Sequence, residues 1–219
     1  TPSTFRGGLK TLMGHKPDHH AMRRCGTATI YTPAPGSEVK LETSRKRLTV
    51  FFSDIKGFTE LSESLEADQM TDMLNHYLSE MSQIIHKYGG TIDKFIGDAI
   101  MVFFGDPTTR GAQTDCLACI SMAIEMKKHM RIMQKHWGSK GIETPLEIRM
   151  GINTGYCTVG NFGTEQRLDY TVLGTEVNLA SRLETAAPPG EILISHETYS
   201  LIKDIVLCEE KGTINVKGF

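Results

Sequence analysis

Two aspartates follow or interrupt apolar stretches of the sequence and could together hold a metal ion. Asp54 ends the run Leu48–Ser53, and Asp98 lies between the strand-like runs TIDKFI and AIMVFF. A strand, a helix and a hairpin in this order commonly place the hairpin beside the first strand, so we expect the carboxylates to meet. Adjacent carboxylates repel one another unless a cation lies between them, and oxygen ligands favour Mg²⁺ or Mn²⁺. On spacing alone, an exposed strand-end aspartate and a turn aspartate remain an open alternative.

The segment Lys56-Gly57-Phe58-Thr59 turns the chain from the first strand toward a helix. Gly57 allows the backbone to approach a ligand closely, and N–H groups exposed at such a point attract anions. A metal pair beside an anion site is the layout of phosphoryl transfer. The patterns GxxxxGK[ST] and GxGxxG are both absent from the sequence, which excludes the common nucleotide-binding folds.

Three further polar residues stand where they could reach a substrate. Arg149 lies on the polar face of an alternating strand that runs from Leu146 to Asn153. Asn178 and Arg182 are spaced i, i+4, so one helix turn brings both side chains to one place. A surface ion pair for Arg149 and two solvated positions for the others are the structural alternatives.

The elements that must position these residues are predicted from hydrophobic periodicity and from glycine and proline signals. Their order, strand, helix, hairpin, helix, strand and then more of both, predicts an α+β sheet with helices on one face. The predicted elements are a strand at 48–53, a helix from about 70 to 88, a hairpin over 91–104, a helix at 113–137, a strand at 146–153, a hairpin at 155–163, a strand at 170–173, a helix from a Thr175 cap to before Pro188, a strand at 192–194, a helix at 196–203, and strands near Val206 and Ile214.

Composition indicates a soluble globular protein of one large domain with an arm. The chain has 219 residues, of which 39% are apolar and 23% are charged. The longest apolar run, Ala99–Phe104, is too short to cross a bilayer. Five scattered cysteines indicate a reducing compartment, and Cys116 and Cys119 lie in an apolar helix pattern typical of core packing. Because there is no initiator methionine and the chain stops abruptly, we interpret it as a fragment.

A basic arm precedes an acidic body. Residues 1–47 carry nine Lys or Arg and three acidic residues, a charge of +6, whereas the remainder carries −8 and the whole chain −2. We interpret residues 1–45 as a linker and residues 46–219 as the catalytic domain. Contact with anionic lipid or with a partner domain remains open for the arm, as does metal binding by His15, His19, His20 and Cys25.

Five motifs occur in register: FFSDIKGFT, DKFIGDAIM, IRMGINTG, YTVLGTEVNLASRLE and NVKG. Together they resemble the catalytic domain of class III nucleotidyl cyclases over residues 46–219 and, within that family, the bacterial adenylate cyclases of the CyaB type. The resemblance implies a ferredoxin-like βαββαβ sheet core with helices on one face and a C-terminal extension. It also implies conversion of ATP to 3′,5′-cyclic AMP and pyrophosphate with two divalent cations, Mg²⁺ or Mn²⁺.

The resemblance further implies a homodimer whose active sites are shared between the chains, with no nucleic-acid partner. It suggests that the basic arm joins a cytoplasmic catalytic domain to an N-terminal membrane or sensor module. The family's site residues fall on Asp54 and Asp98 as metal ligands, the carbonyl of Ile55 as an extra ligand, the amides of Ile55, Lys56, Gly57, Phe58 and Thr59 as a phosphate loop, Arg149 on the triphosphate, Asn178 on the ribose, Arg182 on the phosphorus, and Lys217 on the terminal phosphates.

Lys94 and Thr171 fall on the family's base-selecting positions. Animal membrane adenylate cyclases carry Lys and Asp there, and guanylate cyclases carry Glu and Cys. A lysine donor suits adenine N1, which accepts a hydrogen bond, whereas guanine N1 donates one. The resemblance therefore implies ATP as the substrate, while Thr171 departs from the commoner Asp and is found in a subgroup with some bicarbonate-responsive members.

Three other functions remain open on the sequence. A guanylate cyclase is disfavoured by Lys94, and an inactive nucleotide-binding regulatory domain is disfavoured because Asp54, Asp98 and Arg182 are all present. A plain interaction module would make the motifs coincidental. No histidine falls in the five motifs, so no general base is assigned.

Overall fold

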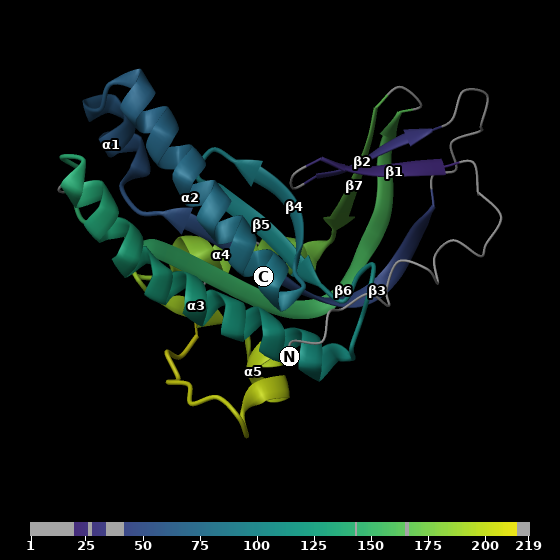
Figure 1. Cartoon of the computed structure of the whole chain (residues 1–219). Helices are drawn as coiled ribbons and strands as arrows, with labels where there is room; N and C mark the ends of the chain where they lie inside the picture. Colours follow the sequence, from purple (N-terminus) through teal and green to yellow (C-terminus); the bar gives the residue numbers. More distant parts are fainter. Residues whose placement is uncertain (1–19, 26–27, 34–41, 143, 165–166, 214–219) are drawn as a thin grey trace, which may run out of the picture.

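The computed structural model describes residues 20–25, 28–33, 42–142, 144–164 and 167–213, with side chains from residue 42 onward. Figure 1 shows the arrangement of the elements. In chain order they are β1 (His20–Cys25), β2 (Ala28–Pro33), β3 (Thr43–Ile55), α1 (Phe58–Ser64), α2 (Ala67–Tyr88), β4 (Thr91–Ile96), β5 (Ala99–Phe104), α3 (Ala112–Ser139), β6 (Ile148–Thr164), β7 (Arg167–Leu173), α4 (Thr175–Ala186), β8 (Ile192–Ile194) and α5 (His196–Ile202).

The central sheet has the strand order β4-β5-β3-β6-β7, and β8 pairs in parallel with β6. β3 lies in the middle and pairs antiparallel with both β5 and β6. The strands β6-β3-β5-β4 and the connecting helices form the predicted βαββαβ core, and β7, α4, β8 and α5 form the C-terminal extension. The hairpin therefore lies beside the first strand of the core, as expected.

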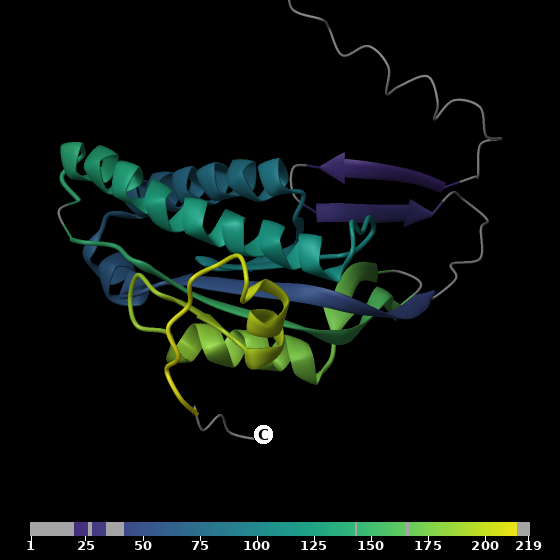
Figure 2. The same ribbon diagram turned by 90° about the horizontal axis from the view of Figure 1, so that it is seen from below.

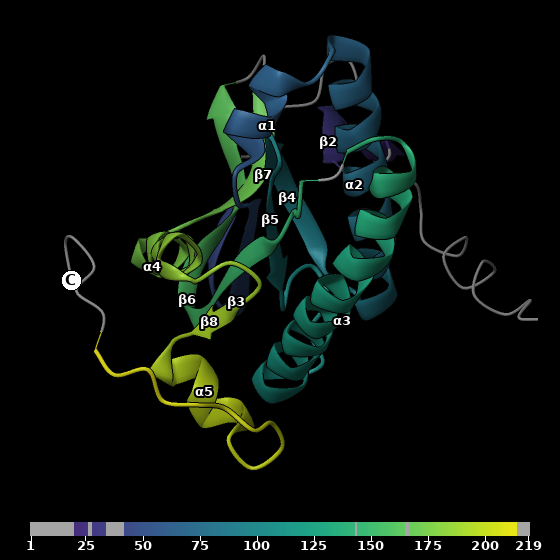
Figure 3. The same cartoon turned by 90° about the vertical axis from the view of Figure 1, so that its left-hand side faces the viewer.

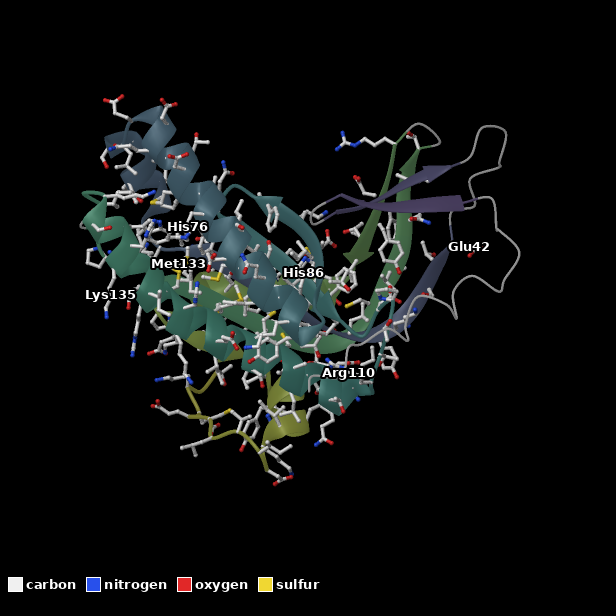
Figure 4. The ribbon with its side chains drawn as sticks, in the orientation of Figure 1. Glu42, His76, His86, Arg110, Met133 and Lys135 are labelled. Atoms are coloured by element: carbon white, nitrogen blue, oxygen red, sulfur yellow. The ribbon has the colours of Figure 1, made fainter. Side chains whose placement is uncertain are left out.

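The two faces of the sheet are covered by different helices, as Figures 2 and 3 show. Successive strand residues point to opposite faces, so Phe51 and Ile55 of β3 join the core under α2 and α3, whereas Leu48 and Val50 join the core under α4. α2 and α3 pack against one another over this face (Figure 4), and Tyr77 of α2 is fully buried in the core beneath them. Both helices of the ferredoxin-like core thus lie on one face, and α4 of the extension covers the other, while α5 packs beside α3.

The predicted hairpin at 155–163 is wrong, because β6 continues unbroken to Thr164. The glycines of this segment do not form a turn; they allow neighbouring parts of the chain to approach β6 closely. A Cβ at Gly155 would lie 2.7 Å from the Glu176 side chain, and one at Gly160 would lie 2.2 Å from the carbonyl oxygen of Glu42. The hairpin instead joins Thr164 to β7.

Two smaller expectations at the end of the chain also differ from the structure. Thr175 is the first residue of α4 rather than its cap, and the capping position is taken by Gly174. Val206 lies in a bend rather than a strand, and Ile214 lies outside the described residues. The cysteines of α3 behave as predicted, because Cys116 and Cys119 are both fully buried.

The arm contains regular structure that the sequence pattern did not predict. β1 and β2 form an antiparallel pair, and β2 lies beside β7 (Figure 1). The proposed metal ligands His15 and His19 lie outside the described residues, and so do the side chains of His20 and Cys25. Within the described part of the chain, no helix is long and apolar enough to cross a membrane.

Candidate active site

The two aspartates meet at one end of the sheet. Asp54 is near the end of β3, and Asp98 lies in the β4–β5 turn, which Gly97 enters with a positive φ of 64°. The backbone N–H of Ile55 donates to Asp98 Oδ2 at 2.9 Å. Burial raises the pKa of the Asp98 carboxyl to about 6; the Ile55 amide opposes this, and the charge of Asp54 reinforces it. The carboxylates therefore form an electrostatically coupled pair.

The chemistry of this pair fits divalent cations with oxygen ligands. A raised carboxyl pKa beside a second carboxylate marks a place where positive charge is favourable. The described residues contain no group of three or more His, Cys, Asp or Glu side chains that could hold a metal ion. Mg²⁺ commonly takes one or two carboxylates and completes its shell with water and substrate phosphates. Asp54 and Asp98 match that donor set, and the carbonyl of Ile55 is the additional ligand that we expect.

Arg149 joins the end of the sheet that carries Asp54 and Asp98 to α4. It stands directly opposite Asp54 in the β3–β6 ladder, and its Nη2 donates to Asp54 Oδ2 at 2.7 Å. Its Nε lies 2.9 Å from Oε1 of Glu184, and Nη1 donates to the Thr185 carbonyl at 3.3 Å. Sequence reasoning missed Glu184, whose one signal is a carboxylate that follows the VNLASRL run on the helix. The guanidinium is held between two carboxylates at the edge of the proposed phosphate site.

α4 is seated unusually close to the sheet by Gly151. A Cβ on this residue would lie 2.1 Å from the Glu184 amide nitrogen and 2.3 Å from the Ala180 carbonyl oxygen. Those are backbone atoms, so relief would require the helix to move. Asn153 tethers the first turn of α4 by donating to the Glu176 carbonyl at 3.0 Å. The short distance between the α4 backbone and β6 therefore fixes how far each side chain of α4 lies from the sheet.

Asn178 and Arg182 lie together on α4, one turn apart, as the spacing predicted. Asn178 is exposed and Arg182 is half-buried. Glu184 lies two residues beyond Arg182, and side chains two apart on a helix do not face the same direction. Glu184 pairs with Arg149 of its own chain, so Arg182 lies on a different face of α4.

Some backbone amides of the loop after β3 already donate hydrogen bonds to other groups of the protein. The Ile55 amide binds Asp98, and the Lys56 amide donates to the Glu147 carbonyl at 2.9 Å. Gly57 adopts the left-handed conformation with φ of 78° and precedes α1, and a Cβ there would meet no atom within 4 Å. The amides of Phe58 and Thr59 open the first helical turn, where N–H groups have no intrahelical acceptor. The amides that can serve a phosphate are therefore those from Gly57 onward.

Lys94 and Thr171 come from opposite edges of the sheet and meet through a residue that sequence reasoning did not single out. The Thr171 hydroxyl donates to Asp93 Oδ2 at 2.6 Å, and Lys94 Nζ lies 3.2 Å from Asp93 Oδ1. The sheet is curled enough for β4 and β7 to touch. The signal for Asp93 was an acidic residue next to lysine in the otherwise apolar strand TIDKFI. Lys217 lies outside the described residues.

The structure thus gathers the predicted residues into separate groups. We call Asp54, Ile55, Asp98 and Arg149 the metal group, and Asp93, Lys94 and Thr171 the base group. Asn178 and Arg182 lie on a face of α4 that differs from the face of Glu184, which contacts Arg149. A pocket between β8, α5 and residues 206–212 is lined by none of these residues.

Comparisons with known proteins bear on the family and the fold of this chain. The profile of the adenylate and guanylate cyclase catalytic domain matches residues 41–219. The solved adenylyl cyclase CyaB from P. aeruginosa is 69% identical, with a TM-score of 0.81 over 82% of this chain and 91% of that chain. The guanylyl cyclase Cya2 is 39% identical, with a TM-score of 0.76 over 80% of this chain and 88% of that chain.

Among curated proteins, an adenylate cyclase from Anabaena cylindrica is 38% identical over 143 residues. The match covers 64% of this chain and 27% of that protein. An adenylate cyclase from Rhizobium meliloti is 32% identical over 80% of this chain and 26% of its own length. The chain therefore spans about a quarter of the length of these two relatives.

Proposed function

The chain belongs to the family of adenylate and guanylate cyclase catalytic domains, and we propose that it converts ATP to 3′,5′-cyclic AMP and pyrophosphate. The observation that carries this proposal is the coupled pair of Asp54 and Asp98 with Arg149 beside it. Two carboxylates that favour a cation next to a guanidinium suit a metal-bound triphosphate. The adenylyl cyclase among the similar structures, with 69% identity, supports ATP over GTP.

The reaction forms one bond and breaks one. The ribose 3′-oxygen bonds to the α-phosphorus and loses its proton to solvent, while the bond from the α-phosphorus to the pyrophosphate oxygen breaks. Bound divalent cations, Mg²⁺ or Mn²⁺, would make the 3′-hydroxyl a better nucleophile and offset charge on the triphosphate. Asp54 and Asp98 would hold them, with the Ile55 carbonyl as a further ligand.

Charge that grows on the phosphate oxygens needs fixed positive groups around it. Arg149 would bind the triphosphate, and the contacts of its guanidinium with Asp54 and Glu184 beside the loop after β3 support this role. The amides from Gly57 to Thr59 would bind phosphate oxygens. Asn178 would orient the ribose, Arg182 would meet the α-phosphate, and Lys217 would reach the terminal phosphates.

We also propose that each active site is shared by two chains of a homodimer. Within one chain, Glu184 contacts Arg149 of the metal group, and Arg182 lies on a different face of the same helix. One protomer would supply the metal group and the phosphate loop, and its partner would supply Lys94, Thr171, Asn178, Arg182 and Lys217. Two-fold symmetry then creates two equivalent sites.

The relatives are several times longer than the matched region, which suggests further modules in the whole protein. We propose that the basic arm links a cytoplasmic cyclase domain to an N-terminal membrane or sensor module. The charge of +6 over residues 1–47 suits a segment close to anionic lipid or to a partner domain.

The direct test is to incubate the protein with ATP or with GTP, in the presence of Mg²⁺ or Mn²⁺, and to identify the products. Cyclic AMP and pyrophosphate should form in equal amounts from ATP, and removal of the cations with a chelator should stop the reaction. Formation of cyclic GMP in preference to cyclic AMP would identify a guanylate cyclase instead. Nucleotide binding without either product would identify a regulatory domain.

A further inference from the structure

Asp93 is a buried carboxylate that the proposed mechanism does not use. Its side chain is only 1% exposed, although it lies next to Lys94, whose side chain is 45% exposed. Residues that are adjacent on a regular strand point to opposite faces of the sheet. The pairing of β4 with β5 is irregular between Ile92 and Lys94, and such a bulge redirects side chains. The bulge explains how Asp93 and Lys94 come to face one another.

Asp93 connects the two residues proposed to contact the base. Its Oδ2 accepts from the Thr171 hydroxyl at 2.6 Å and from the Val172 backbone N–H at 3.2 Å. Its Oδ1 lies 3.2 Å from Lys94 Nζ as an ion pair. Thr171 is itself buried, with 7% of its surface exposed. One carboxylate thus binds a hydroxyl from one edge of the sheet and an ammonium from the other.

This arrangement decides the hydrogen-bonding role of Thr171. A threonine hydroxyl has one hydrogen to donate and two lone pairs to accept with. Because its hydrogen is directed to Asp93, only lone pairs remain for a substrate. Lys94 offers the opposite property, since an ammonium donates and never accepts. The base group therefore presents one donor and one acceptor in fixed positions.

We propose that Asp93 is a positioning residue for base selection, which fixes the Thr171 hydroxyl as an acceptor and orients the Lys94 ammonium as a donor. Adenine matches this pair, because its N1 accepts and its 6-amino group donates. Guanine opposes both, because its N1 donates and its O6 accepts. The inference rests on the proposed cyclase function and on the base contacts of Lys94 and Thr171. It adds that discrimination by Thr171 depends on a carboxylate that does not touch the substrate.

The test measures base preference without requiring turnover. We would measure the affinities of 3′-deoxy-ATP and 3′-deoxy-GTP, which lack the attacking hydroxyl, by calorimetry with Mg²⁺. In the Asp93→Ala variant the released hydroxyl can donate to O6, so the affinity ratio of adenine to guanine should fall about 10-fold, the worth of one hydrogen bond. Thr171→Val, which removes the hydroxyl, should lower the affinity ratio of adenine to guanine by a similar factor. In the double variant the ratio should fall by less than the product of the two single effects, because Asp93 acts in part through Thr171.

Asp115 provides a matched control away from the site. Its carboxylate is also buried, accepts from the Thr109 hydroxyl at 2.6 Å and from the Arg110 amide at 3.2 Å, and is ion-paired with Arg110. Asp115→Ala should change stability without changing the affinity ratio. If Asp93 has a purely structural role, Asp93→Ala should likewise leave the affinity ratio unchanged, with the affinities for both nucleotides falling together.

A second substitution keeps the test decisive if Asp93→Ala does not fold. Asp93→Asn preserves the volume, but its single oxygen cannot accept from Thr171 and face Lys94 at the same time, so the ratio should again fall. An unchanged ratio in a folded Asp93 variant, with a lowered ratio in Thr171→Val, overturns the role of Asp93 alone. An unchanged ratio in both overturns the base assignment as well. Formation of cyclic AMP by the unchanged protein tests the proposed function separately.

Discussion

Arg149 and Asp54 stand directly opposite one another on β6 and β3, with Arg149 Nη2 at 2.7 Å from Asp54 Oδ2. Glu184 holds the same guanidinium from α4. Asp98 meets the end of the same strand through the Ile55 amide. At the end of β3 the proposed metal ligands and the guanidinium proposed to bind phosphate therefore orient one another, so a change in one of them should affect the others.

Replacing either metal carboxylate should abolish activity while preserving the fold. Asp54→Asn and Asp98→Asn keep an oxygen that can accept from Arg149 or from the Ile55 amide, but they remove the charge that offsets a divalent cation. Electrostatic stabilisation by a metal is worth several kcal/mol, so cyclic AMP formation should fall by at least about 100-fold. Asp72→Asn, an exposed position on α2, is the control and should retain full activity. Near-normal rates in either site variant would contradict the metal assignment.

Two glycine substitutions should have opposite effects on stability. Gly151→Ala drives a Cβ into the backbone of α4 at 2.1 Å, so the helix must shift; we expect a loss of about 3 kcal/mol of unfolding free energy and a large loss of activity. Gly138→Ala in α3 meets no atom within 4 Å and should stabilise the protein by about 0.5–1 kcal/mol. Thermal unfolding of both variants, with cyclase assays, measures the difference. Equal melting temperatures would show that α4 can relax away from the sheet.

Sequence periodicity predicted the elements and their order better than it predicted the uses of glycine. The strand and helix patterns around Asp54 and Asp98 predicted that these side chains would meet. Hydrophobic periodicity identifies each element from its own residues, and the usual connection rules place the hairpin beside the first strand. Gly155 and Gly160 suggested a turn but instead allow Glu176 and the Glu42 backbone to approach β6. Whether a glycine turns the chain or admits a neighbour depends on tertiary contacts that a local pattern does not contain.

The same limit applies to the site. Asp54, Asp98 and Arg149 stood out because they end or line predicted strands. Asp93 and Glu184 did not stand out, since their partners Thr171 and Arg149 are distant in the sequence. Their roles depend on the curl of the sheet and on the close seating of α4.

The interface between α2 and α3 should make stability depend on pH through His76. Burial lowers the pKa of His76 from its ordinary value of 6.5; His136 at 4.8 Å between ring centroids lowers it further, as do Lys140 and His129, while Glu80 opposes them. The unfolded chain therefore takes up a proton at higher pH than the folded protein does. The unfolding free energy should be insensitive to this group above about pH 6.5 and should fall as the pH drops below it.

Chemical denaturation between pH 8 and pH 5 would measure this dependence, in the range where His76 changes protonation. His76→Gln should flatten the profile, whereas His86→Gln, at an exposed position on the same helix, should leave it unchanged (Figure 4). A profile that stays equally steep in His76→Gln would assign the pH dependence to other groups.

Base choice should follow the residues at positions 94 and 171. Lys94→Glu with Thr171→Cys replaces the donor that faces adenine N1 by an acceptor suited to guanine N1. The double variant should lose its preference for ATP by at least about 100-fold, because a wrong base leaves polar groups unpaired in the pocket. Competition between ATP and GTP in one reaction, with both cyclic products quantified, gives the ratio directly. A ratio equal to that of the unchanged protein would place base recognition elsewhere.

The shared site predicts recovery of activity when two inactive variants are mixed. Asp54→Ala removes a metal ligand and Arg182→Ala removes the group proposed for the α-phosphate, so each homodimer should be inactive alone. After random exchange of subunits, about half of the dimers are mixed, and each mixed dimer has one site with both defects and one with neither. About one quarter of the wild-type activity should therefore return. Subunit exchange is verified with differently tagged chains. If exchange is complete and no activity returns, both residues act within a single chain, and the position of Arg182 on a face of α4 that differs from that of Glu184 needs another explanation.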